Sequence, residues 1–228
     1  MKRTYFFSVL RKPSLISSVH LLRFFNNKCG VVIGGHLRWH FKSLIETAEE
    51  VINVDSCPSN LEGRTEVDYV TDAANLSFAL DGSQDFVCSS HVLEHLANPL
   101  KAIGEWKRVI KEEGIIYVGV PDKRYIFDHK RQRTPLSHLI DDFEKGVDQT
   151  DKTHISDFLE NRDEKGVCCE SGEKLTEHAG EGFESRVHHH VWIVEDLKEI
   201  FEYTDLRILY GPVLHHGTIH IAGQKRRQ

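Results

Sequence analysis

The chain has 228 residues, a length that suits one α/β domain with a core large enough to need no disulfides. Apolar residues make up 39% of the chain and charged residues 28%, which is typical of a globular protein and excludes a disordered chain. The five cysteines show no C-x-x-C spacing, so we expect a reducing, cytoplasmic compartment rather than a disulfide scaffold.

The net charge of −6 is unevenly distributed, because residues 1–45 hold eight Lys and Arg and no acidic residue. This start could be a helix that covers the sheet, a membrane-surface segment or a cleaved targeting peptide. No apolar run reaches the ~18 residues that a membrane span needs. We predict a basic helical segment at 1–29 and one domain at 30–228. The basic segment could associate peripherally with a membrane or bind a glycosyltransferase. Nucleic acid is not expected as a partner, because no basic patch follows.

Short apolar runs alternate with helical patterns along the first half of the chain. We expect strands at residues 30–33, 51–54, 66–70, 86–88 and 114–120. Helical periodicity predicts helices at residues 37–50 and, from apolar residues every three or four positions, 93–110. This order predicts a parallel sheet with helices on both faces.

The second half of the chain opens with a change of character. Residues 141–184 hold 14 acidic against five basic residues, which predicts an insertion, either a mobile lid or partly helical. A helix at 195–203 and strands at 206–210 and 218–222 are expected after it. The last two strands have the pattern of an antiparallel pair at the sheet edge.

Polar and glycine residues follow the first three predicted strands. Gly34 and Gly35 come after the first, where glycines let a nucleotide approach the backbone. Asp55 ends the second strand, 21 residues after Gly34, the spacing of an acid that binds ribose hydroxyls. The alternative is a tight turn beside an exposed loop aspartate. Asp72, after the third strand, could bind an adenine amino group, although an acid there is more often a helix N-cap.

The segment His91-Val-Leu-Glu94-His95 matches the H-x-x-E-H pattern of inverted zinc proteases. Two histidines four positions apart on a helix could hold zinc, with Glu94 as base. The motif opens directly from a buried strand, however, and another strand follows within 20 residues. This strand–helix–strand organisation argues against a protease.

The sequence SSHVLEHLANPLKAIGEWKRVIKEEGIIYVGVP, at residues 89–121, resembles the block after the fourth strand of class I S-adenosylmethionine-dependent methyltransferases of type 11. Residues 121–128 and 187–192 are more loosely similar to methyltransferase-like proteins of glycan and polysaccharide biosynthesis. The resemblance implies a Rossmann-like α/β fold: a seven-stranded, mostly parallel sheet with helices on both faces and an antiparallel C-terminal hairpin. It also implies S-adenosylmethionine as cofactor.

Carried onto this chain, the resemblance implies a set of residues around the cofactor. They are Gly34, Gly35, Asp55, Ser56, Asp72, Ala73, Ser90 and His91. The chain departs from the family at Val32, where an acidic residue is usual, and at His36, where a glycine is usual. The alternative function is therefore a non-catalytic module that binds a nucleotide-like ligand or a glycosyltransferase partner.

Methyl transfer to a sugar hydroxyl is an in-line displacement that needs a general base, for which histidine is suited near neutral pH. The candidate bases are His91, His129 and His190. The polar residues expected to bind the acceptor are Asp122, Arg124, Asp128, Arg131 and His188. His188 and His190 could face one side of an extended segment and, with carboxylates, hold a divalent metal. We predict O-methylation of a small-molecule or glycan acceptor, with no metal in the principal prediction.

Overall fold

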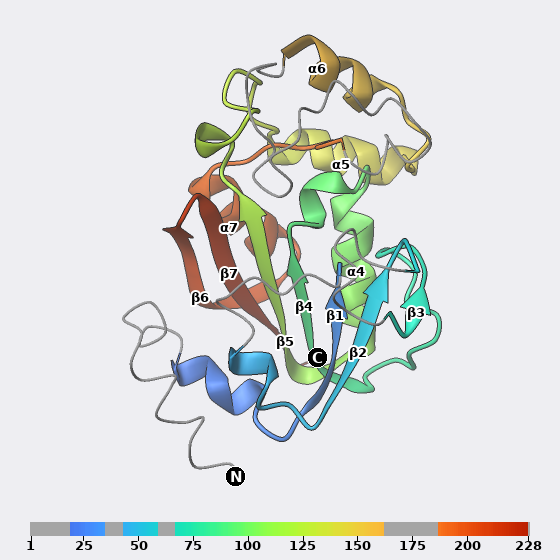
Figure 1. The fold of residues 1–228 in the computed structure, drawn as a ribbon, viewed down its shortest axis with the longest axis vertical. Coiled ribbons are helices and arrows are strands. Elements are labelled where there is room, and N and C mark those ends of the chain that lie inside the picture. The colour runs from blue at the N-terminus through green and yellow to red at the C-terminus, as the bar shows by residue number, and fades with distance from the viewer. Residues whose placement is uncertain (1–18, 35–42, 59–66, 162–186, 228) are drawn as a thin grey trace.

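A computed structural model describes residues 19–34, 43–58, 67–161 and 187–227 (Figure 1). These residues form a seven-stranded sheet in the order β3-β2-β1-β4-β5-β7-β6. The strands are β1 (Cys29–Ile33), β2 (Glu50–Asp55), β3 (Tyr69–Val70), β4 (Gln84–Ser90), β5 (Ile110–Pro121), β6 (Leu206–His215) and β7 (Thr218–Lys225). Strands β1 to β5 pair in parallel, and β7 runs antiparallel to both β5 and β6. The predicted Rossmann-like sheet with its antiparallel hairpin is confirmed.

Helices cover both faces of this sheet and its upper end. The α-helices are α4 (Pro99–Val109), α5 (Leu136–Lys145), α6 (Thr153–Asn161) and α7 (Val194–Tyr203), and the 3-10 turns are η1 (Val19–Phe24), η2 (Leu93–His95) and η3 (Lys123–Tyr125). Figure 1 shows α4 and α7 behind the sheet, and α5 and α6 above the carboxyl ends of β4 and β5. None of the described helices is long and apolar enough to span a bilayer.

The apolar strands are buried on both faces, which explains their near-continuous hydrophobic runs. In β1, Val31 packs in the cluster that contains Trp106 of α4, whereas the next residue, Val32, packs with Leu21 and Phe25 near η1. Residues 1–18 of the predicted N-terminal segment lie outside the described residues. The described part of that segment packs on the sheet through the buried side chains of Leu21 and Phe25.

The predicted helix at residues 93–110 begins too early, while its predicted end lies within one residue of the end of α4 at Val109. Residues 93–95 make only a 3-10 turn, and α4 begins at Pro99. The Asn98 side chain accepts a hydrogen bond from the Lys101 amide at 3.0 Å, and proline occupies the first helical turn. Both features start a helix. Since the histidines at 91 and 95 do not share an α-helix, the zinc-protease geometry is absent from this segment.

Other expected boundaries shift by several residues. The strand expected at 66–70 is limited to Tyr69–Val70, and the strand expected at 114–120 is longer, running from Ile110 to Pro121. Of the helix expected at 37–50, residues 37–42 lie outside the described part, and β2 already begins at Glu50.

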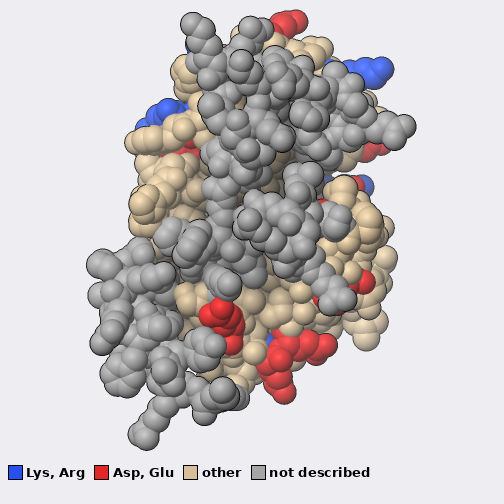
Figure 2. All heavy atoms as spheres, viewed as in Figure 1, with Lys and Arg blue, Asp and Glu red and all other residues tan. Residues whose placement is uncertain are grey.

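The predicted acidic insertion is partly helical where it is described, with a loop at residues 146–152 between its two helices. Its described part ends α5 and contains α6, while residues 162–184 lie outside the described ranges. On the face drawn in Figure 2, the described Lys and Arg side chains lie apart from one another rather than in one basic patch. The expectation that nucleic acid is not a partner stays a prediction.

Candidate functional site

The turn after β1 requires a glycine. Gly34 has a φ of +88°, and a Cβ there would lie 2.2 Å from Cγ2 of Val92, so any side chain would clash. Its amide donates to the Val54 carbonyl at 2.8 Å, which fixes the turn against β2. Gly35, the other predicted loop glycine, lies outside the described residues. The backbone at Gly34 therefore lies at the carboxyl end of β1 without a side chain covering it.

Asp55 is the last residue of β2 and lies at the same sheet edge, because Val54 pairs with Ile33 at the end of β1. Its Oδ1 accepts a hydrogen bond from the Cys57 amide at 3.2 Å, and the hydroxyl of the exposed Ser56 lies 3.4 Å away. The carboxylate is thus oriented at the strand end, where a ribose is expected.

Asp72 and Ala73 follow β3 in a turn. The exposed Asp72 accepts a hydrogen bond from the Ala74 amide at 2.7 Å, so its carboxylate stabilises this turn. Ala73 is buried, and its carbonyl accepts a hydrogen bond from Nε1 of Trp106 at 2.8 Å. This bond fixes the turn against α4. Contact of either residue with an adenine ring stays a prediction.

His91 follows Ser90, the buried end of β4, and takes an unusual backbone conformation. Its φ is +55°, a conformation that non-glycine residues adopt mainly in turns and functional sites, and its amide donates to the Gly119 carbonyl at 2.8 Å. Its Nε2 lies 3.1 Å from the Thr218 hydroxyl, and its Nδ1 lies 3.5 Å from the buried Glu94 carboxylate. The imidazole is therefore held by two polar groups from different elements.

A hollow of about 560 Å³ opens beside His91, at the carboxyl end of β5. It is lined by His91, Pro121, Tyr125, Ile126, Leu214, His216, Gly217 and Thr218. Its position next to the end of β4 makes it the candidate acceptor pocket.

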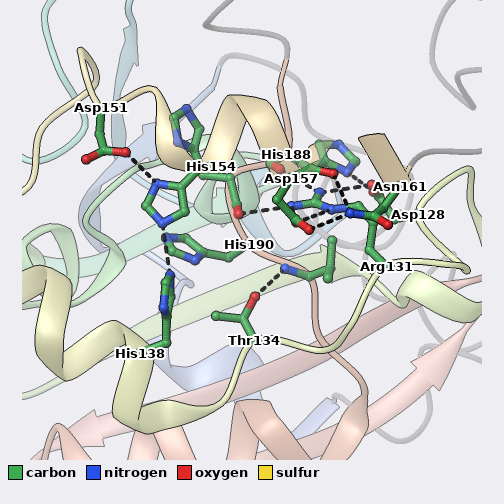
Figure 3. A network of polar contacts seen from close by, with 12 residues as sticks. Asp128, Arg131, Thr134, His138, Asp151, His154, Asp157, Asn161, His188 and His190 are labelled. Atoms are coloured by element: carbon green, nitrogen blue, oxygen red, sulfur yellow. Dashed lines mark hydrogen bonds and ion pairs between the residues drawn. The ribbon is translucent and has the colours of Figure 1, made fainter. Parts of the chain in front are cut away.

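Three predicted acceptor-binding residues come together in a buried network (Figure 3). Arg131 donates to Asp128 at 3.0 Å and to the carbonyl of His188 at 2.7 Å, and it also pairs with Asp157 of α6. Nδ1 of His188 lies 2.5 Å from Asp128. Because Asp128 and Arg131 are buried, this arrangement favours a role in holding residues 187–193 against α6. Direct contact with an acceptor stays a prediction.

Asp122 and Arg124 form a second pair, in which only the arginine reaches solvent. Asp122 is fully buried, and its carboxylate accepts from the Arg124 guanidinium at 2.9 and 2.5 Å. Hydrogen bonds to this carboxylate raise the pKa of Arg124. The arginine side chain is half-exposed beside Tyr125 of the hollow, where it could meet an anionic acceptor.

The three predicted bases lie in three different surroundings. The exposed His129 has its Nδ1 3.2 Å from the Ile126 carbonyl. His190 is fully buried and contacts the Ala97 carbonyl at 3.2 Å, and desolvation lowers its pKa well below the usual range. His190 and His188 have different partners, so the expected shared pocket is not what the structure shows. Of the three, only His91 lines the hollow.

Sequence reasoning missed the residues that surround His190. His138 and Asp142 of α5 and His154 of α6 cluster with it, and two of these three fall in the stretch predicted as an acidic insertion. The i, i+4 spacing of His138 and Asp142 was the only local signal, since it places both on one side of a helix. Glu94 was weighed only as a protease base, whereas in the structure it lies beside His91.

Comparison with known proteins gives one family match. Residues 29–118, which contain β1 to most of β5, match the family described as methyltransferase domain. No curated protein shows a significant sequence match.

Solved structures with similar folds are remote in sequence. A chain of the Haloferax volcanii complex between the Trm112 methyltransferase activator and its assigned methyltransferase has a TM-score of 0.55 at 13% identity, over 92% of this chain and 89% of that one. An S-adenosylmethionine-dependent methyltransferase from Thermotoga maritima has a TM-score of 0.51 at 16% identity, over 99% and 95%. A protein assigned as a zinc-dependent alcohol dehydrogenase of Rhodobacter sphaeroides has a TM-score of 0.55 at 14% identity, over 93% of this chain and 89% of that one. Because names and activities differ among these structures, the likeness shows the fold alone.

Proposed function

We propose that the chain is an S-adenosylmethionine-dependent methyltransferase that methylates an oxygen of a sugar or glycan intermediate. The proposal rests mainly on the placement of Gly34, Asp55 and Ser90 at one sheet edge, inside the stretch that matches a methyltransferase domain. In open α/β sheets, ligands bind outside the carboxyl ends of the strands. The domain match together with the fold supports S-adenosylmethionine as the cofactor.

His91 is the base that this geometry favours. Bound S-adenosylmethionine supplies an electrophilic methyl group, and the protein aligns the acceptor oxygen with it. His91 takes the hydroxyl proton, and the carboxylate of Glu94, 3.5 Å from Nδ1, stabilises the imidazolium that forms. Nε2 is the atom that takes this proton, so the acceptor hydroxyl replaces the Thr218 hydroxyl, which lies 3.1 Å from Nε2.

The lining of the hollow supports a polar acceptor. Thr218 and His216 provide hydrogen-bonding groups, and Tyr125 provides an exposed aromatic side chain. The half-exposed guanidinium of Arg124 would suit the phosphate of an acceptor such as a nucleotide sugar.

Titration calorimetry with S-adenosylmethionine and S-adenosylhomocysteine tests the cofactor part of this proposal. We expect saturable binding of both, and Asp55→Ala should weaken it by more than about tenfold, because a hydrogen bond to a charged group contributes roughly 1.5–3 kcal/mol. Glu202→Gln, which removes an exposed carboxylate from α7, is the matched control and should bind normally.

Two results would contradict the proposal. Absence of binding at millimolar ligand would remove the enzyme function, and unchanged affinity of Asp55→Ala would remove the ribose assignment. Binding without methyl transfer to any sugar, glycan or nucleotide-sugar acceptor would instead favour the non-catalytic module. That alternative rests on Val32, which is buried in β1 where the family usually has an acidic residue.

A further inference from the structure

Four potential metal ligands converge above the sheet from three separate segments. Figure 3 shows three of them, His138, His154 and His190. His138 and Asp142 come from α5, His154 comes from α6, and His190 comes from the segment that precedes α7. One potential ligand atom from each of the four side chains lies within 4.8 Å of the others. This cluster is separate from the residues proposed to bind the cofactor.

The separations within the cluster match those around a small cation. Nε2 of His138 lies 3.0 Å from Nε2 of His154, and Oδ2 of Asp142 lies 3.2 and 3.3 Å from these two nitrogens. In a tetrahedral zinc site with bonds of about 2.0–2.1 Å, neighbouring ligand atoms are roughly 3.3 Å apart. Three of the four ligands therefore already have the required spacing. Nε2 of His190 lies 3.9 Å from the carboxylate and would leave the Ala97 carbonyl, now 3.2 Å away, to bind the ion.

His138 and His154 share one hydrogen bond, but the Asp142 carboxylate is poorly satisfied within the cluster. Asp142, His154 and His190 are at least nine-tenths buried. Oδ2 of Asp142 nevertheless receives no hydrogen bond from any described residue, despite its closeness to two imidazoles. Buried polar atoms in proteins nearly always have a partner, and an unmade contact costs about 1–3 kcal/mol. A cation at the centre would satisfy the carboxylate and the imidazole lone pairs together.

Neighbouring contacts hold the ligands in position. Oδ1 of Asp151 lies 3.7 Å from Nδ1 of His154, beyond hydrogen-bond distance but on the side from which a carboxylate often orients a metal-binding histidine. The backbone carbonyl of Asp142 accepts a hydrogen bond from Asn98, whose side chain also caps α4. The partly exposed His138 leaves a route for an ion from solvent.

We propose that His138, Asp142, His154 and His190 bind one divalent transition-metal ion, and that zinc fits them best. Three imidazoles and one carboxylate are ligands that zinc accepts in tetrahedral geometry, whereas calcium and magnesium prefer oxygen ligands. The ion would join α5, α6 and the segment around His190 across the top of the sheet. This proposal does not depend on methyl transfer.

Metal titration of the untagged, full-length protein tests the site. After chelator treatment, Zn²⁺ is titrated in competition with a chromogenic chelator, and Co²⁺ is added in a parallel sample to record the visible spectrum. We expect one saturable ion per chain and the strong absorption of tetrahedral Co²⁺. Absence of saturable binding, or only weak octahedral Co²⁺ bands, would overturn the proposal.

Single substitutions then assign the ligands. Asp142→Asn and His138→Ala should each weaken zinc binding by at least about a hundredfold, since even outer partners of metal ligands contribute 10–100-fold. His138 is partly exposed, so its variant should fold normally, which circular dichroism would verify. Asp141→Asn, at an exposed neighbour on the same helix, is the matched control and should bind zinc as the wild type does.

The outcome also separates this site from another cluster in the molecule. Glu94, His95 and His188 form a further group with metal-ligand spacing. Zinc affinity unchanged by both Asp142→Asn and His138→Ala would place the ion elsewhere and overturn the assignment. An equal loss in Asp141→Asn would indicate a general effect of surface charge and would overturn it as well.

Discussion

The sheet and the layer above it are stabilised in different ways. The sheet buries apolar side chains such as Val87 and Val118 on strands that are covered by helices. The layer above, which we call the cap and define as residues 122–161 and 187–193, buries Asp128, Arg131 and several histidines around a small apolar cluster. Apolar burial depends little on pH or ions, whereas buried charges depend on their partners and on protonation. The cap should therefore respond to conditions that leave the sheet unchanged.

Removal of the Arg131 guanidinium should have the largest effect on this contrast. Arg131→Met leaves the buried Asp128 without its cationic partner, and breaking such a pair costs about 3–5 kcal/mol. Hydrogen exchange should accelerate in residues 127–134 and 187–193, while the amides of β4 and β5 stay protected. Lys145→Met, at an exposed lysine whose partner Asp141 is also exposed, is the control and should change neither region by more than about 0.5 kcal/mol.

The Arg131 experiment could also contradict the comparison. Equal loss of protection in the cap and in β4 would show that the two regions unfold as one unit. An unchanged cap in Arg131→Met would show that its apolar cluster, which contains Phe127 and Phe158, is sufficient to hold it.

A smaller effect is expected from pH, through His95 beneath the cap. Desolvation lowers the pKa of His95 well below its usual value, and its Nδ1 contacts the Val187 carbonyl at 3.1 Å. When the cap opens, the pKa returns to about 6.5, so the open state binds more protons below that pH. The free energy of cap opening should fall as pH decreases below about 6.5, by up to about 1.4 kcal/mol per pH unit.

Hydrogen exchange at about pH 7.5 and about pH 5.5, corrected for intrinsic rates and with a chelator present, measures this dependence. His95→Gln should reduce the pH dependence in the cap without abolishing it, because the pKa values of His154 and His190 are lowered as well. The same change at the exposed His129 should leave the dependence as it is. A pH dependence of equal size in β5 would contradict the contrast between the two regions.

The sheet could be predicted from sequence because its signals are local. Apolar runs such as residues 30–33 mark the strands, and the resemblance at residues 89–121 implies a seven-stranded, mostly parallel sheet with an antiparallel C-terminal hairpin. The start of α4 was not predicted, although Asn98 and Pro99 are typical of a helix N-terminus, because the apolar periodicity continues across them. The turn at Gly34 was anticipated, and its close approach to Val92 explains why a glycine is required there.

The cap could not be predicted in the same way. His138 and His190 are 52 positions apart, so no local spacing connects them, and only the packing of α5 against the segment before α7 brings them together. The alternation of His188 and His190 suggested one shared pocket, but the two imidazoles meet different partners, Asp128 and Ala97. Charge pairing among buried residues depends on tertiary contacts that a sequence pattern does not contain.

A crystal structure with S-adenosylhomocysteine tests the central claim most directly. The account predicts that the ribose hydroxyls contact Asp55, that the backbone at Gly34 lines the amino-acid part of the ligand, and that the sulfur faces His91 beside the hollow. A ligand bound away from the carboxyl ends of β1, β2 and β4, or one whose sulfur faces a histidine other than His91, would contradict it.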